Sequence, residues 1–139
     1  MNVIKKISPE WALRLGLGLM YLYSGYDLIV KPSHWYGFVP QWFSQMVTQT
    51  TSVENYLRIQ GMGEGLIGVL FLAWFLPRYA VRTACLVTIL EMSMISLFVG
   101  IDPITFRDIG LLGAALALFI MTISRDFPKE ISGQATHSP

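Results

Sequence analysis

The most regular feature of the chain is a series of long apolar runs separated by short polar segments. None of the runs alternates strictly between apolar and polar positions, as barrel strands do. About 20 residues in an α-helix cross the hydrocarbon core of a bilayer, and lipid offers no partners for unpaired backbone groups. The pattern predicts an all-α, polytopic membrane protein, a four-transmembrane-helix bundle in one domain over 1–139, with helices at 11–30, 57–76, 81–100 and 105–124.

The connections between the runs are of two kinds. Pro77 and Arg78 form a very short turn after the second run, and Asp102 and Pro103 form another after the third, so we expect two antiparallel hairpins. Segment 31–56 is long and rich in aromatic residues, which concentrate at membrane–water interfaces. We expect this loop to lie on the interface or to fold over the bundle. Its aromatic residues include Trp35, Tyr36, Phe38, Trp42 and Phe43.

The distribution of positive charge predicts the orientation, because cytoplasmic segments are enriched in Lys and Arg. One side of the predicted bundle carries most of the cations: Lys5, Lys6, Arg14, Arg78, Arg82, Arg125 and Lys129. The other side carries Lys31, Arg58 and Arg107. We therefore expect a multi-pass protein of the cell membrane with both termini, including the polar tail 125–139, in the cytoplasm. The first run is longer than the apolar part of a signal peptide, so we expect it to remain as a helix.

Composition agrees with a membrane protein and excludes several other classes. Of the 139 residues, 53% are hydrophobic and 14% are charged, against about 25% charged in soluble domains. A net charge of +1 gives no reason to expect a nucleic-acid partner. The single cysteine, Cys85, and two histidines outside the runs offer no Cys-rich metal site and no bis-histidine haem. We expect no metal site and no intrinsic cofactor.

Ionisable residues inside the predicted spans are the candidate functional residues, because charges in hydrocarbon are costly and usually face the bundle interior. The predicted topology places all of them except Arg14 and Arg82 in the outer half of the bundle. Glu64 and Glu91 lie deepest and are the catalytic candidates, and we expect Glu91 to be protonated much of the time. The substrate-binding candidates lie nearer the helix ends: Asp27, Arg58, Arg107 and Asp108.

A structural role for the same charges stays open. Buried ion pairs can fix helix packing without chemistry, and Arg107 with Asp108 can anchor and stabilise a helix N-terminus. Asp27 can reach the outer surface. Small residues on three of the predicted helices are interpreted as packing seams: Gly18 and Gly25; Gly61, Gly65 and Gly68; Gly110, Gly113, Ala114 and Ala117.

Several of these segments resemble DoxX-like membrane proteins. The stretch from Leu13 to Asp27 is similar to their first helix, where an arginine–leucine start leads to a small-residue pair and an acid that lysine often follows. Here Leu28 follows the acid and Lys31 comes a turn later. Three further stretches are similar to an aromatic loop and to the second and fourth helices of that family: Trp35–Trp42, Gly61–Glu64 with Gly68, and Arg107–Ala114.

The resemblance covers about 11–124 and implies a four-helix protein of the DoxX/DoxD-related group. Members of that group are associated with thiosulfate:quinone oxidoreductase and other membrane redox systems, often as a small subunit beside a partner. It implies a subunit or accessory protein that binds a quinone or a sulfur oxyanion near Glu64, Glu91, Arg58 and Arg107. Arginine would supply forked donors to an oxyanion, and a protonated glutamate could pass protons. A membrane scaffold or assembly factor and a small transporter are the alternatives.

Overall fold

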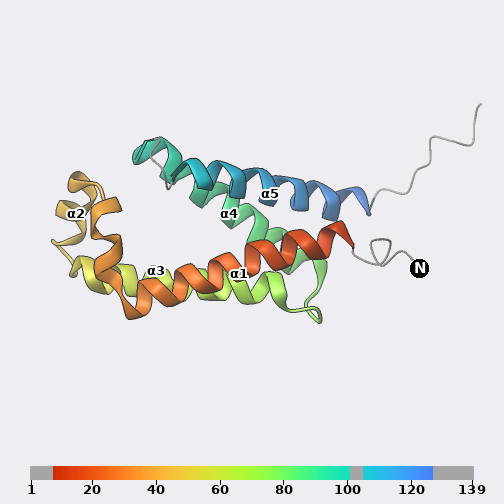
Figure 1. Cartoon of the computed structure of the whole chain (residues 1–139), viewed down its shortest axis with the longest axis horizontal. Helices are drawn as coiled ribbons and strands as arrows, with labels where there is room; N and C mark the ends of the chain where they lie inside the picture. Colours follow the sequence, from red (N-terminus) through yellow and green to blue (C-terminus); the bar gives the residue numbers. More distant parts are fainter. Residues whose placement is uncertain (1–7, 101–104, 127–139) are drawn as a thin grey trace, which may run out of the picture.

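The computed structural model describes residues 8–100 and 105–126, and the regular structure in these ranges is helical. Figure 1 shows the helices in chain order: α1 (Pro9–Val30), the 3-10 helix η2 (Pro32–Phe38), α2 (Gln41–Val47), α3 (Val53–Leu72), α4 (Arg78–Phe98) and α5 (Thr105–Ser124). Some predicted features lie outside the described residues: Lys5, Lys6, Lys129, the turn at Asp102 and Pro103, and most of the polar tail (127–139).

The four long predicted helices are present, and the largest difference in their bounds is at α3. The apolar run predicts 57–76, whereas α3 begins at Val53 and ends at Leu72. Ser52 caps its N-terminus, since the Ser52 side chain accepts a hydrogen bond from the Asn55 N–H. At the other end, Pro77 disfavours a helical conformation in the residue before it. Residues 73–76 are therefore a connection, although they are as apolar as the helix.

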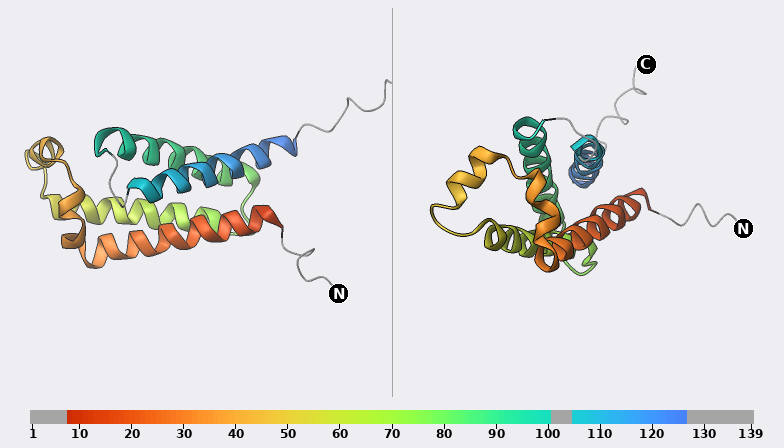
Figure 2. Two further views of the ribbon diagram at one scale, coloured as in Figure 1. Left: turned by 45° about the horizontal axis from the view of Figure 1, so that its top comes forward. Right: turned by 60° about the vertical axis from the view of Figure 1, so that its left-hand side comes forward.

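The helices pack as two pairs. The most extensive contacts join α1 to α3 and α4 to α5, and α3 touches α4 much less. In Figures 1 and 2, α1 and α3 run side by side in opposite directions. A short connection does join the second and third predicted runs, 57–76 and 81–100. However, α3 packs mainly on α1 and only slightly on α4.

Glycines allow the close approach of α1 and α3. A Cβ atom on Gly25 would lie 2.6 Å from the Gly61 carbonyl oxygen, and one on Gly61 would lie 2.7 Å from the Gly25 oxygen. Gly18 and Gly68 form a second close contact further along the same pair. The helix backbones touch at these positions, so the predicted small-residue seam is confirmed at Gly18, Gly25, Gly61 and Gly68.

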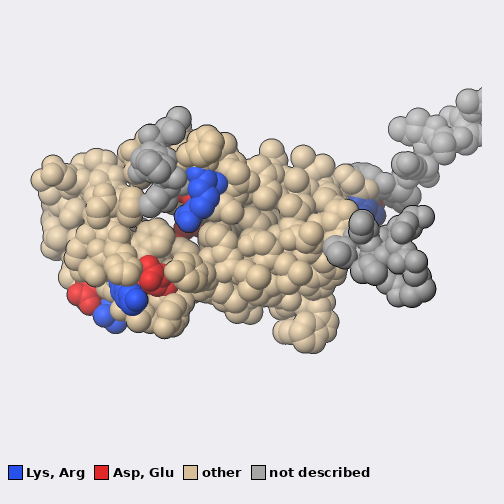
Figure 3. Space-filling view, viewed as in Figure 1, with Lys and Arg blue, Asp and Glu red and all other residues tan. Residues whose placement is uncertain are grey.

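Large apolar side chains cover much of the exposed surface, and α4 and α5 are long and apolar enough to cross a membrane. Between the charged side chains of its left half and a basic group near its right end, the face in Figure 3 has a section where the described residues show no Lys, Arg, Asp or Glu. A surface of this kind is unusual for a soluble domain and suits contact with lipid. The exposed apolar residues include Leu19, Tyr23, Ile59, Leu66, Leu90, Leu97, Phe106 and Ile120.

Candidate functional site

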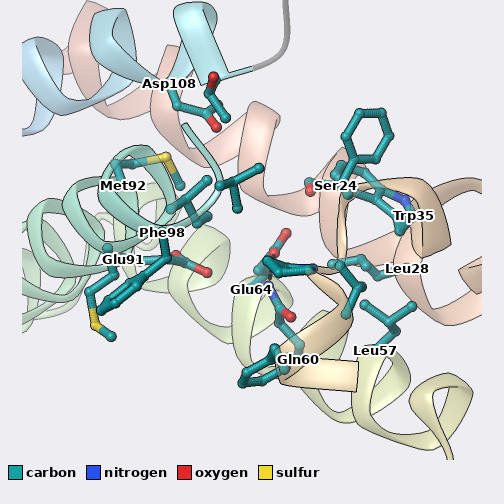
Figure 4. Close-up of a pocket in the computed structure, with 18 of the residues that line it drawn as sticks. Ser24, Leu28, Trp35, Leu57, Gln60, Glu64, Glu91, Met92, Phe98 and Asp108 are labelled. Atoms are coloured by element: carbon teal, nitrogen blue, oxygen red, sulfur yellow. Dashed lines mark hydrogen bonds between the residues drawn. The ribbon is translucent and has the colours of Figure 1, made fainter. Parts of the chain in front are cut away.

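A cavity of about 720 Å³ lies where η2 and α2 meet the ends of the four long helices. Its volume falls in the range of small-molecule sites, roughly 300–1,000 Å³. Figure 4 shows side chains from several helices converging on it. The packing of α1 on α3 and of α4 on α5 leaves room between the two pairs, and the cavity occupies this room.

The polar end of the cavity is built around two glutamates on facing helices. The Tyr21 hydroxyl on α1 donates a hydrogen bond of 2.7 Å to Glu91 Oε2 on α4. Gln60 Nε2 donates to Glu64 Oε1, one helical turn further along α3, at 3.3 Å. In Figure 4, Glu64 lies between Glu91 and Ser24. The two carboxyl groups therefore share one polar region that α1, α3 and α4 enclose.

Glu64 has an oxygen that nothing in the described part of the chain satisfies. The residue is 7% exposed, and its Oε2 atom is buried without a hydrogen-bond partner among the described residues. A buried polar atom left unpaired costs about 1–3 kcal/mol. Because Glu64 lines the cavity, a ligand that donates a hydrogen bond can satisfy this oxygen if the carboxyl group turns toward the cavity.

Aromatic side chains form much of the remaining cavity wall. Trp42 packs on Phe43 and on Phe98 with ring centroids 5.6 Å and 5.8 Å apart, and Phe43 packs on Tyr56 at 5.1 Å. These contacts join α2 to α3 and to the end of α4. With Trp35 from η2, the rings make most of the cavity surface apolar.

Asp27 lies outside the cavity lining and holds η2 in place. Its Oδ2 atom accepts a hydrogen bond of 2.9 Å from Trp35 Nε1 and lies 3.3 Å from His34 Nδ1. Trp35 itself lines the cavity. The predicted substrate-binding residue thus positions a residue of the wall.

Arg58 also lies outside the cavity lining. Its guanidinium is 2.8 Å from Glu54 Oε1, one turn earlier on α3, and both side chains are about half exposed. An exposed pair of this kind adds little to stability. The expectation that Arg58 converges with the two glutamates is not met, because α3 turns it to the surface.

Arg107 and Asp108 lie at the start of α5 and do line the cavity. Arg107 NH2 is 3.5 Å from Asp108 Oδ1, with Asp108 buried and Arg107 more than half exposed. The structure therefore brings together four of the six predicted site residues: Glu64, Glu91, Arg107 and Asp108.

Sequence reasoning missed the neutral polar residues of the site. Tyr21 and Ser24 are three positions apart on α1, and Gln60 is four positions before Glu64 on α3. These spacings place each pair on one helix face. A search for uncharged polar residues at helical spacing from the buried acids would have found Gln60. Tyr21 could be identified only from the relative position of α1 and α4, because its partner Glu91 lies on the other helix.

The opposite end of the bundle has its own charged cluster. Arg14, buried on α1, donates hydrogen bonds to the carbonyl oxygens of Phe71 and Ala73 at the end of α3, at 2.7 Å and 2.9 Å. Arg82 similarly donates to the Thr122 carbonyl oxygen near the end of α5. These arginines satisfy carbonyl groups that a helix end leaves unpaired. Their role is structural.

A scan against protein-family models found no match, and no curated protein or solved structure matches the chain. Among the described residues, no three His, Cys, Asp or Glu side chains group closely enough to hold a metal ion.

Proposed function

We propose that the chain is a four-span protein of the cell membrane, with both termini in the cytoplasm and the cavity in the outer half of the bundle. Helices α4 and α5 have the length and hydropathy of spans. Helices α1 and α3 contain 22 and 20 residues, also enough to cross a bilayer. Their buried charges have partners or face the cavity, as charges within a membrane do: Arg14 caps α3, and Glu64 lies at the cavity wall.

For the activity, we propose a small subunit or accessory protein of a membrane redox system, similar to the DoxX-like group, whose cavity binds a quinone-type ring. The observation that supports this is an aromatic, apolar cavity that ends at Glu64 and Glu91. A quinone ring is flat and apolar with an oxygen at each end, so it can stack on the rings and hydrogen-bond at the polar end. A partner subunit would exchange electrons with the bound ring.

The charge of the cavity favours a quinone over a sulfur oxyanion. Among the described residues that line it, the acids Glu64, Glu91 and Asp108 outnumber the cation Arg107. An oxyanion in this environment would be repelled unless several donors surrounded it. Arg58, which could have added positive charge, is paired with Glu54 on the surface.

One observation favours the alternative of a non-enzymatic scaffold. The Tyr21–Glu91 hydrogen bond joins α1 to α4, and a buried polar contact between helices can serve packing alone. The scaffold proposal predicts that the cavity binds no quinone.

The test is quinone binding by the purified full chain in lipid nanodiscs. Trp35 and Trp42 line the cavity, so a bound decyl-benzoquinone should quench tryptophan fluorescence. Ser24→Phe places a ring inside the cavity and should weaken binding by about 10-fold or more, the loss of roughly 1.4 kcal/mol of contacts. Leu19→Phe adds the same ring to α1 at an exposed position and is the matched control. Absence of saturable quenching in the wild type, or equal affinity of the two variants, would contradict the proposal.

A further inference from the structure

Two donors beside Glu64 and Glu91 are already engaged with these carboxyl groups. The Tyr21 hydroxyl is directed to Glu91 and the Gln60 amide to Glu64. Ser24 lies beside Glu64 in Figure 4. The Tyr21 and Gln60 donors are thus already directed at the two carboxyl groups.

The acceptor that remains is Glu64 Oε2. It is buried at the cavity wall, with no partner in residues 8–100 or 105–126. An ionised carboxylate has about four lone-pair sites, and a protonated one still keeps acceptor capacity beside its one donor. Sharing one proton between Glu64 and Glu91 therefore leaves acceptors in excess.

We infer that the cavity selects a head group that donates hydrogen bonds, so that a quinol binds in preference to the corresponding quinone. A quinol carries two hydroxyl donors on the same flat ring, whereas a quinone carries only carbonyl acceptors. One hydroxyl pointing at Glu64 Oε2 would satisfy the unpaired atom, while a quinone oxygen there would face another acceptor. This inference rests on the proposed function, because it requires a ring of this type in the cavity.

The apolar wall is suited to the rest of such a molecule. Val87, Leu90 and Met94 line the cavity on α4 and are 41%, 64% and 55% exposed. They lie on one helix face, at spacings of three and four residues. A tail attached to the ring can leave the cavity over this face and continue into lipid.

The test compares three ligands of one shape by calorimetry, with the full chain in nanodiscs and without oxygen. They are a decyl-benzoquinone, its quinol, and the dimethyl ether of that quinol, which lacks both donors. A hydrogen bond to a charged group is worth enough to give the quinol about a 10-fold or greater advantage over the other two. Glu64→Gln replaces the free oxygen or its neighbour with a donor and should remove most of the preference. Glu54→Gln, at an exposed acid on the same helix, should keep it.

The outcomes separate the inference from the proposed function. Equal affinity for the three ligands in the wild type overturns the donor preference and leaves a quinone site standing. Failure of all three to bind overturns the proposed function itself. A preference that survives in Glu64→Gln shows that another group receives the donor, and overturns the assignment to Glu64. The wild-type comparison stands even where a variant does not fold.

Discussion

Individual charged residues of this chain have different roles because the folded structure gives them different partners. Arg14 is 6% exposed and donates to two carbonyl oxygens of another helix, whereas Arg58 is paired on the surface. Among the acids, Glu64 faces the cavity and Asp27 holds Trp35. Residue type alone does not distinguish these cases.

Asp126, just after α5, gives a prediction of pH dependence. A hydrogen bond from Arg82, together with the charges of Arg82 and Arg78, holds the pKa of Asp126 below its ordinary value of 3.8. Because the folded pKa is the lower one, the contact stabilises the folded protein above pH 3.8 and is lost as pH falls through the folded value. We expect a carboxyl NMR titration to give a midpoint below 3.8.

Arg82→Gln tests the cause of that shift. Removing the guanidinium removes both the hydrogen bond and the nearer charge, so the Asp126 midpoint should move up toward the ordinary value. Arg58→Gln, which leaves this end of the bundle unchanged, is the control. An unchanged midpoint in Arg82→Gln would show that the Arg82–Asp126 contact does not form in solution.

At the scale of the helices, not every glycine of a small-residue pattern lies in a contact. Gly61 and Gly65 form a GxxxG pattern and both backbones lie close to Gly25, but only a Cβ on Gly61 would meet α1. A Cβ on Gly65, Gly110 or Gly113 would meet no described atom within 4 Å outside its own helix backbone. The predicted seam on α5 is therefore an open face at its glycines.

Alanine substitution along α3 tests this difference. Gly61→Ala places a methyl group 2.7 Å from the Gly25 carbonyl oxygen, so the helices must separate, at a cost of about 1–3 kcal/mol. Gly63→Ala meets no described neighbour within 4 Å and should stabilise the helix by up to about 1 kcal/mol. Thermal unfolding in detergent measures both. Equal effects of the two substitutions would contradict the α1–α3 contact.

At the scale of the whole molecule, the charges divide between the two ends of the bundle. Arg14, Arg82 and Asp126 lie at one end, in contacts that hold helix ends. The acids of the cavity lie toward the other end, where η2 and α2 cover the cavity. The membrane proposal assigns the first end to the cytoplasm and the second to the outside.

Cysteine labelling tests that assignment. In a Cys85→Ala background, which removes a buried thiol, Gln45→Cys on α2 should react with a membrane-impermeant maleimide in intact cells. Phe75→Cys, in the connection from α3 to α4 where Phe75 is 72% exposed, should react only after permeabilisation. The reverse pattern would contradict the orientation, and labelling of both from one side would mean that α3 does not cross the membrane.

The sequence predicted the helices well because their signal is local. Run length and hydropathy depend on neighbouring residues, so α1, α4 and α5 begin and end within three residues of the predicted bounds. The end of α3 was predicted four residues too late, because residues 73–76 are apolar enough to continue a helix. Arg14, distant in the chain, binds its last carbonyl groups instead.

The site was predicted only in part, because membership depends on how each helix is rotated. Glu64, Glu91, Arg107 and Asp108 reach the cavity, and Asp27 and Arg58 do not.

By itself, then, the amino-acid sequence determined that the chain forms long apolar helices and that some carry costly charges, since both properties follow from composition along a single segment. Only the tertiary structure decided which acids share a cavity, which glycines touch, and that Glu64 keeps an unpaired oxygen. Those outcomes depend on the distance and rotation between helices, which many weak contacts set together.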